Sequence, residues 1–140
     1  MMPAALNHII VPARDKWESA RFLGGILGLE AGPEWGHFVP VRVGHVTIDF
    51  ENAKSFSHHH CAFLLSETEF DAALDRIKKA GIAFFAEFDR TGPGEINRNY
   101  GGRGVYFDDP GGHLFELITR PYGDLPERWI DGRAVRATGG

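Results

Sequence analysis

The hydrophobic and polar positions of this chain follow one order of elements twice. In the first half, a β-branched apolar run at 6–11 predicts a strand. Apolar residues at helical spacing between Asp15, a candidate N-cap, and Gly28, a candidate stop, predict a helix. Two more strand-like runs follow at 38–43 and 45–50, so this half is expected to fold as strand, helix and strands.

The second half repeats that order. The run at 60–65 predicts a strand, and Ser66 with Glu69 three residues later has the pattern of a capping box. The helix that follows is expected to end at Gly81, and a Gly-rich loop spans 91–102. Three further strands are predicted, at 82–88, 104–107 and 114–119.

The two halves align by spacing, because His8 lies 20 residues before Gly28 (28 − 8) and His60 lies 21 before Gly81 (81 − 60). Each half alone would leave one face of its sheet uncovered, and pairing the halves would bury both faces. We therefore expect one α+β domain over residues 1–140. Its parts are module one at about 5–51, a polar linker at 52–57, module two at about 58–120, and a tail without assigned chemistry at 121–140.

Composition places the chain among small globular proteins. Its 140 residues suit one domain, and 43% hydrophobic and 24% charged residues argue against disorder. The net charge of -4 and the scattered Lys and Arg residues argue against a nucleic-acid surface. Cys61 is the sole cysteine, so no disulfide forms within the chain. No run approaches the ~18 apolar residues of a membrane helix, and the N-terminus lacks signal-peptide features, so we expect a cytoplasmic protein without membrane contact.

Glu116 is the most informative single residue. It lies in the apolar run 114–118, where both faces of the strand are expected to be buried. An ionised carboxylate in such a place costs several kcal/mol unless a positive charge compensates it. A metal cation would supply that charge; the alternatives are an ion pair with an Arg and an edge strand with one wet face.

Two histidines begin the two modules at equivalent places. His8 lies in an apolar strand, either as a metal ligand or as a hydrogen-bonded core residue. His60 begins the matching strand, and strand alternation puts it on the same face as His58 and away from His59. The alternative for His60 is a polar strand entrance. Pairing of the modules would bring the two strands near one axis and Glu116 to the same cavity.

Two histidines and one carboxylate form a facial triad that leaves coordination positions open for substrate or water. His8, His60 and Glu116 are therefore predicted to hold one divalent metal ion, with Zn, Ni, Fe, Mn and Co as candidates. Asp49 is a further candidate, because its apolar neighbours mirror those of Glu116; the alternative is a solvated strand face. Glu116 or Asp49 is also the candidate catalytic group that moves a proton.

Three segments carry a resemblance to a known family. They are 6–11, 60–63 and 103–117, and the third holds the turn 109–112 (Asp-Pro-Gly-Gly) followed by an acid in an apolar strand. Over about residues 5–122 the chain resembles the vicinal oxygen chelate superfamily. That superfamily contains glyoxalase I, extradiol dioxygenases, and fosfomycin- and bleomycin-resistance proteins.

The resemblance implies paired βαβββ modules whose sheets curl around a metal cavity. It places the metal ligands on His8, His60 and Glu116. The fourth ligand of glyoxalase I corresponds to Asp49, where that enzyme has Glu. A homodimer is expected, with modules paired within one chain or across two. The acid and base of extradiol dioxygenases have three candidates here: Tyr106, His113 and Tyr122.

Two classes of function follow. The first is a metalloenzyme of glyoxalase or dioxygenase type, in which the metal binds two adjacent oxygens of a small substrate and stabilises an anion. Its reaction stays open between a lyase or isomerase step and ring cleavage by oxygen. The second is a metal-independent drug-binding protein of the bleomycin-resistance kind. The candidates to line its cleft are aromatic: Trp35, Phe38, Phe85 and Tyr100. The alternative for these residues is a place in the core.

The polar, Gly-rich segment 92–102 is long enough to act as a lid. Loops held by rigid sheets often carry specificity. Substrate contacts are therefore expected from this region and the strand after it; the alternative is a surface turn. The candidates are Asn97, Asn99, Arg103 and Tyr106.

Overall fold

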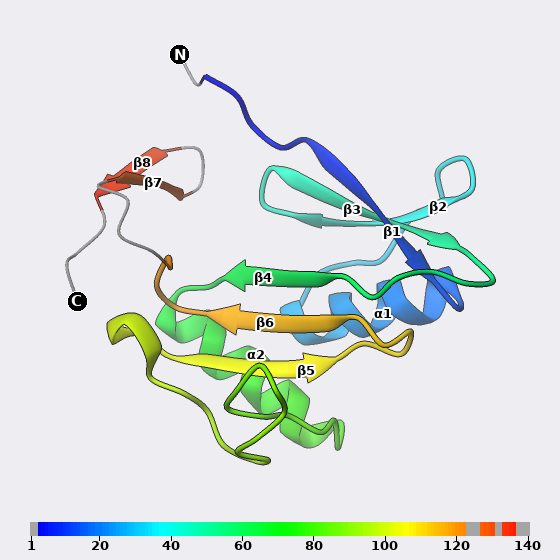
Figure 1. The fold of residues 1–140 in the computed structure, drawn as a ribbon. Helices are drawn as coiled ribbons and strands as arrows, with labels where there is room; N and C mark the ends of the chain where they lie inside the picture. Colours follow the sequence, from blue (N-terminus) through cyan, green and yellow to red (C-terminus); the bar gives the residue numbers. More distant parts are fainter. Residues whose placement is uncertain (1–2, 123–126, 131–132, 137–140) are drawn as a thin grey trace. The chain divides into compact units, whose positions relative to one another are not determined.

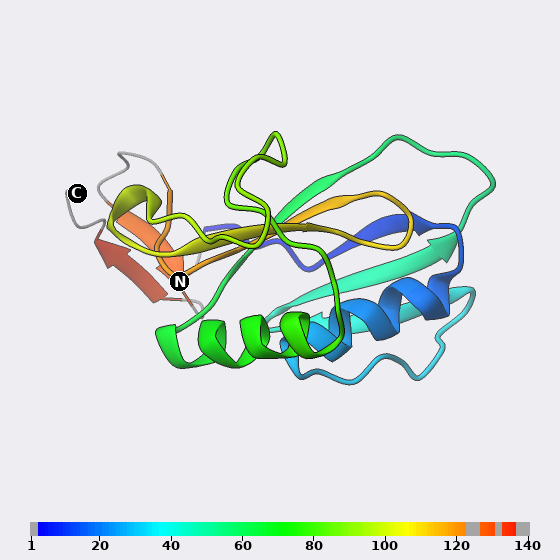
Figure 2. The same cartoon turned by 90° about the horizontal axis from the view of Figure 1, so that it is seen from below.

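The computed structural model describes residues 3–122 together with the backbone of 127–130 and 133–136. The chain forms two compact units: unit one contains Met1–His59 and Asp109–Gly112, and unit two contains His60–Asp108 and His113–Gly140. The main sheet of each unit has three strands, and one α-helix lies on one face of it (Figures 1 and 2). The chain is therefore an α+β protein, as the sequence predicts. Pairing of the modules into one domain stays a prediction.

Unit one follows the predicted order of elements. These are β1 (His8–Ala13), α1 (Lys16–Leu27), β2 (Phe38–Val43) and β3 (Val46–Asn52). The sheet order is β1-β3-β2, with β1 parallel and β2 antiparallel to β3. Leu23 and Ile26 of α1 are buried where the helix packs against this sheet.

Unit two has the same topology with extra elements. These are β4 (His60–Leu64), α2 (Glu67–Lys79), a short 3₁₀ helix η1 (Asn99–Gly101), β5 (Gly104–Asp108) and β6 (Leu114–Ile118). The sheet order is β4-β6-β5, with β4 parallel and β5 antiparallel to β6. A separate antiparallel pair, β7 (Glu127–Ile130) and β8 (Arg133–Arg136), lies in the tail to which the sequence assigned no chemistry.

Both helices begin with the predicted caps. The Asp15 side chain accepts two backbone N–H bonds from the first turn of α1, at 3.0 and 3.2 Å. Gly28 ends that helix with φ at 72°, a left-handed conformation that Gly adopts without strain. The Ser66 hydroxyl accepts the backbone N–H of Glu69 at 3.1 Å, which caps α2.

The predicted strand at 82–88 is wrong. Phe85 alone pairs with Tyr106, as an isolated bridge, and Ala86 donates its backbone N–H to Gly92 at 3.0 Å. Gly92 adopts a φ of 68°, so the chain turns back and uses its backbone groups within the loop. The expected βαβββ module has a strand directly after its helix. In both units that strand is reduced to isolated bridges.

Strand register places the candidate residues of the two units at equivalent positions. In unit one, His8 on β1 lies opposite the residue two before Asp49 on β3. In unit two, His60 on β4 lies opposite the residue two before Glu116 on β6. Because residues two apart in a strand share a face, His8 and Asp49 share one face of their sheet. His60 and Glu116 share one face of theirs in the same way.

The turn Asp109–Gly112 belongs to unit one through a buried hydrogen bond. The Ser19 hydroxyl on α1 donates to Asp109 Oδ2 at 2.9 Å, and both residues are buried. Gly111 donates its backbone N–H to the other Asp109 oxygen at 3.0 Å. The acidic turn that marks the family resemblance is thus tied to a helix 90 residues earlier in the chain.

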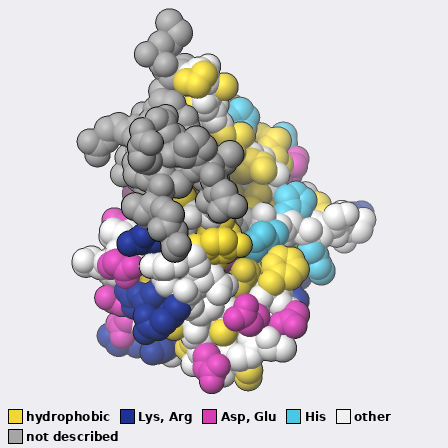
Figure 3. Space-filling model, turned by 60° about the vertical axis from the view of Figure 1, so that its left-hand side comes forward, with side chains coloured by type: hydrophobic (Ala, Val, Ile, Leu, Met, Phe, Trp, Pro, Cys, Tyr) yellow, Lys and Arg dark blue, Asp and Glu magenta, His cyan; other side chains and the backbone are white. Residues whose placement is uncertain are grey.

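Basic and acidic side chains are interleaved on the face drawn in Figure 3. Among the ion pairs of unit two, the Arg103 guanidinium donates to Glu67 at 2.8 Å and to Asp71 at 2.7 Å. None of the helices in the described part of the chain has the length and apolar content that spanning a bilayer requires.

Candidate functional site

Glu116 lies on β6, the middle strand of the unit-two sheet, and is only 1% exposed. Its Oε1 lies 3.1 Å from Nε2 of His60, and its Oε2 accepts a hydrogen bond from the Tyr122 hydroxyl. Within residues 3–122 no Lys or Arg forms an ion pair with this carboxylate. The Arg partner considered from the sequence is therefore not found there, and an imidazole takes its place.

His60 is held so that one ring nitrogen faces Glu116. Its Nδ1 lies 3.0 Å from the backbone oxygen of Leu114, the residue opposite His60 in the sheet. A carbonyl oxygen only accepts, so Nδ1 carries the hydrogen and donates it. Nε2 then meets a carboxylate oxygen, and a proton or a metal cation between the two completes the contact.

The donor set of this pair fits a divalent transition metal. Two metal–ligand bonds of about 2.1 Å at a right angle place their N and O donors about 3 Å apart. That distance is close to the 3.1 Å between His60 Nε2 and Glu116 Oε1. The pair can therefore supply two adjacent positions of a metal site, and at least one more ligand is needed to complete it.

Two phenols and a Phe ring surround the pair. Tyr106 lies opposite Glu116 on β5, and burial, with the Glu116 carboxylate next, raises the pKa of its hydroxyl to about 12. The same two causes raise the pKa of Tyr122 above its ordinary value. The His60 ring stacks on Tyr106 with centroids 6.1 Å apart and meets the edge of Phe88 at 5.3 Å. Both phenols stay protonated at neutral pH.

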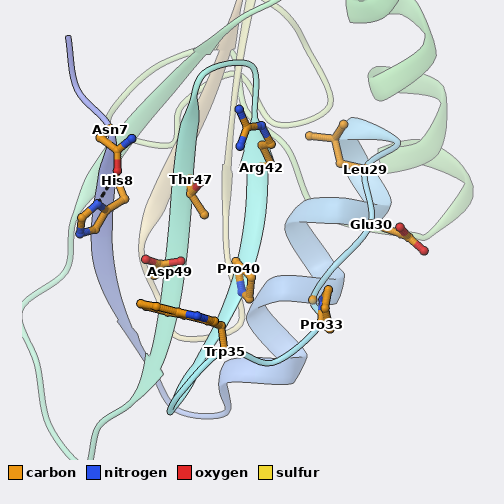
Figure 4. Close-up of a pocket in the computed structure, with 11 residues that line it drawn as sticks. Asn7, His8, Leu29, Glu30, Pro33, Trp35, Pro40, Arg42, Thr47 and Asp49 are labelled. Carbon is orange, nitrogen blue, oxygen red and sulfur yellow. Dashed lines mark hydrogen bonds between the residues drawn. The ribbon is translucent and has the colours of Figure 1, made fainter.

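A groove of about 730 Å³ lies on unit one. The strand residues that line it include His8 and Asp49. Along each strand these residues alternate with residues of the core, so they lie on the sheet face opposite the core. In the view of Figure 4 the Trp35 ring lies at one end of the groove beside Asp49, and Arg42 stands at the other end. The His8 imidazole Nδ1 is 2.8 Å from Oδ1 of Asn7.

Asp49 is buried without a side-chain partner. It is 7% exposed, and its carboxylate forms no hydrogen bond or ion pair with any residue in 3–122. Asp49 is thus less exposed than His8 and Arg42, which line the same groove. A buried carboxylate left unpaired is costly, so Asp49 is suited to accept a bond from a ligand O–H or to bind a cation.

Trp35 and Arg42 add recognition groups to the groove. Trp35 is 71% exposed, yet its ring stacks on Phe38 with centroids 6.3 Å apart, and its backbone pairs with Phe38 in both directions. Arg42 is exposed and its guanidinium has no partner among the described residues. The groove thus combines a fixed aromatic surface, a free cation and a buried anion.

The structure places the predicted site residues in two sets. His60, Glu116 and Tyr106 are brought together in unit two. His8 and Asp49 line the groove of unit one. No group of three or more His, Cys, Asp or Glu side chains suited to a metal ion is found among the described residues. The complete triad predicted from the sequence stays a prediction.

The predicted loop contacts to substrate have other partners in this structure. Asn97 is buried and donates from Nδ2 to the backbone oxygen of Ala86 at 2.7 Å, while its Oδ1 accepts the N–H of Asn99. Arg103 forms ion pairs with Glu67 and Asp71 of α2, and its guanidinium lies over the Phe70 ring. Asn97 thus holds the loop and Arg103 bonds to α2, whereas Asn99 is exposed. Contact of these residues with substrate stays a prediction.

Two groups of the site were not singled out as binding groups from the sequence. Arg42 is the lone basic residue of β2, and alternation with the apolar Val41 and Val43 is the signal that places it on the groove face. Tyr122 was named only as an available acid or base. Its contact with Glu116 depends on the path of the chain after β6, which no local pattern predicts.

Comparison with known proteins identifies the family of the chain. Among curated proteins, the chain is 26% identical over 124 residues to glutathione transferase FosA of Serratia marcescens, covering 83% of this chain and 81% of that protein. It is 29% identical over 137 residues to fosfomycin resistance protein FosX of Listeria innocua, covering 91% and 96%. These relatives include enzymes.

Among solved structures, oxidase ChaP-H2 is 49% identical with a TM-score of 0.83, covering 87% of this chain and 98% of that chain. A lactoylglutathione lyase from Agrobacterium tumefaciens shares the fold at 19% identity and a TM-score of 0.64, covering 84% and 94%. Residues 5–117 match the family model described as the Glyoxalase/Bleomycin resistance protein/Dioxygenase superfamily. The chain therefore belongs to the glyoxalase/bleomycin resistance protein/dioxygenase superfamily.

Proposed function

We propose that this chain is a metal-dependent oxidase that acts on a small substrate with two adjacent oxygen atoms. The observation that carries the proposal is the buried Glu116 carboxylate, which forms with His60 a pair of donors at metal-ligand spacing. The 49% identity to an oxidase over 87% of this chain favours oxidation over a glyoxalase-type lyase step.

His8, His60 and Glu116 are the proposed ligands, and Asp49 is the proposed fourth ligand or base. A divalent transition metal held by such ligands would supply Lewis-acid polarisation of substrate oxygens and, if redox-active, a route for electrons to dioxygen. The hydrogen bond from His60 Nδ1 to the Leu114 carbonyl keeps the ring oriented with its other nitrogen toward Glu116. Orientation of this kind prepares the site before a substrate arrives.

The groove of unit one is the proposed substrate site. The exposed Trp35 ring offers a surface on which a flat substrate can stack. Arg42 offers an unpaired guanidinium for an anionic substrate oxygen. Asp49 offers an unpaired buried carboxylate that can accept the proton of a substrate O–H group. A hydroxylated, planar compound with adjacent oxygens satisfies all three.

The test combines metal loading with oxygen consumption. Untagged protein and a Glu116→Gln variant are loaded with Fe, Mn, Ni or Zn and assayed against catechols and α-hydroxyketones. An oxidase removes two electrons and two protons from the substrate and transfers them to dioxygen, which gives hydrogen peroxide. Oxygen consumed should therefore equal peroxide formed, and the variant should lose both. Turnover that needs no dioxygen would contradict the proposal, and ¹⁸O in the product without peroxide would identify a dioxygenase instead.

A homodimer that shares its metal sites is the proposed assembly, because His8 belongs to unit one whereas His60 and Glu116 belong to unit two. Mixing a His8→Ala variant with a Glu116→Gln variant tests it. In a mixed dimer with shared sites, the intact His8 of one chain meets the intact His60 and Glu116 of the other, so metal binding returns. No return on mixing, although mixed dimers form, would contradict site sharing.

Ligand sequestration without metal is the second candidate function, and the groove with its exposed Trp35 favours it. Fosfomycin and bleomycin, which the names of a relative and of the family contain, are the probes. Quenching of tryptophan fluorescence in the presence of a chelator, lost in a Trp35→Phe variant, would support sequestration. The same probes without effect, beside turnover that requires metal, would exclude it.

A further inference from the structure

Tyr122 is the second partner of the Glu116 carboxylate, and the proposed function gives it no role. Its hydroxyl donates to Oε2, whereas Oε1 faces Nε2 of His60. The two oxygens of one buried carboxylate are thus divided between a phenol on one side and an imidazole on the other.

The strand pairing of the sheet does not by itself place Tyr122. The family model matches residues 5–117, and Tyr122 follows that segment, beyond the end of β6. Tyr106, the other phenol, is placed opposite Glu116 by the strand pairing of the sheet itself. Tyr122 lies in no strand, so other contacts must hold it in place.

The ring of Tyr100 provides one such contact. The Tyr100 and Tyr122 ring centroids are 4.3 Å apart, with an interplanar angle of 37°. Tyr100 lies in η1 with a φ of 55°, a conformation that costs a residue other than Gly about 1 kcal/mol or more. The loop residue that lies against Tyr122 is therefore held in an unfavourable backbone conformation, as is common for residues that support a site.

We infer that Tyr122 is a positioning residue that restricts Glu116 to binding the metal through one oxygen. The phenol occupies Oε2, which leaves Oε1, beside His60, as the oxygen available to the metal. Carboxylates bind metals through one or both oxygens, and a hydrogen bond to one of them selects the first mode. This inference rests on the metal site of the proposed function.

The consequence concerns specificity as well as affinity. A Glu that uses one oxygen leaves one more coordination position open than a Glu that uses both. A substrate with two adjacent oxygens needs two such positions. The Tyr122 hydroxyl would thereby keep free the space that chelation of the substrate requires.

Co(II) titration of the full chain tests the inference. The wild-type protein, Tyr122→Phe and the matched control Tyr100→Phe are titrated against a chromophoric chelator, and the visible absorption of bound Co(II) is recorded. Tyr122→Phe should lose about tenfold in Co(II) affinity, since loss of such an outer partner typically costs 10–100-fold. Its Co(II) absorption should also weaken and shift, because Oε2 becomes free to bind and raises the coordination number. Tyr100→Phe keeps both its ring and the Tyr122 hydroxyl, and should match the wild type.

The outcomes separate this inference from the proposed function. Wild-type binding with the same affinity and spectrum in Tyr122→Phe would overturn the role of Tyr122 and leave the metal site standing. A wild-type protein that binds no Co(II) would overturn the metal site, and the role of Tyr122 with it. Tyr122 is only half-buried and Phe keeps the ring against Tyr100, so the variant should fold, which thermal unfolding of the metal-free proteins checks.

Discussion

Replacing Glu116 with Gln separates the charge of this carboxylate from its shape. In the metal-free chain the amide keeps both contacts: its oxygen accepts from the Tyr122 hydroxyl, and its N–H donates to the Nε2 lone pair of His60. No buried donor or acceptor loses its partner. The free energy of unfolding of the metal-free chain should therefore change by about 1 kcal/mol or less.

The metal-loaded chain should respond differently. A ligand that binds only the folded state stabilises it by about 2.7 kcal/mol when its free concentration is 100 times Kd. For a chain of 140 residues, where 1 kcal/mol corresponds to about 3 °C, that is a rise in Tm of about 8 °C. The neutral amide of the Glu116→Gln variant lacks the charge that holds the cation, so the variant should show almost no rise.

Thermal unfolding with and without Co(II) or Zn(II) measures both effects. Glu69→Gln, which removes an exposed acid of α2, is the matched control and should keep the metal-dependent rise. An equal rise in Glu116→Gln would refute the role of Glu116 as a ligand. A loss of several kcal/mol in the metal-free variant would show instead that the carboxylate serves a structural ion pair with a protonated His60.

Three further variants address the groove, the turn and the loop. Arg42→Ala should raise KM for an anionic substrate about tenfold, which corresponds to about 1.4 kcal/mol, with metal content unchanged; an unchanged KM would contradict the placement of substrate in the groove. Ser19→Ala leaves the buried Asp109 without one donor and should lower the free energy of unfolding by about 1–3 kcal/mol, measured in urea. Asn97→Ala removes the bond to the Ala86 carbonyl and should cost about as much, while an altered Co(II) affinity in that variant would assign the loop a role in the site.

Local signals in the sequence predicted the elements that local interactions determine. Asp15 and Ser66 cap the two helices as predicted, because a cap is made with backbone groups two or three residues away. The apolar residues of 82–88 predicted a strand. Gly92 instead turns the chain back, and the backbone N–H of Ala86 donates to the Gly92 carbonyl within the loop. Only Ala86 of this segment is buried and Phe88 is 59% exposed, so its apolar composition marks neither a sheet strand nor a core element.

The prediction of the site was based largely on the internal repeat. Equivalent spacing in two modules pointed to His8 and His60, and a carboxylate in an apolar strand pointed to Glu116. The contact between His60 and Glu116 joins residues 56 apart, which the repeat allowed the sequence to anticipate. The burial of Asp49 could not be anticipated, because polar neighbours on its strand suggested a solvated face.

The sequence by itself determined the α+β class, the order of elements in the first module and the choice of candidate ligands, because these depend on periodicity, caps and spacing along the chain. The tertiary structure alone decided which carboxylate oxygen faces His60 and which accepts from Tyr122. It also decided that Asp49 is buried without a partner in a groove that Arg42 shares. Burial and hydrogen-bond partnership are set by strands and loops that are distant in sequence, and no local pattern encodes which of them will meet.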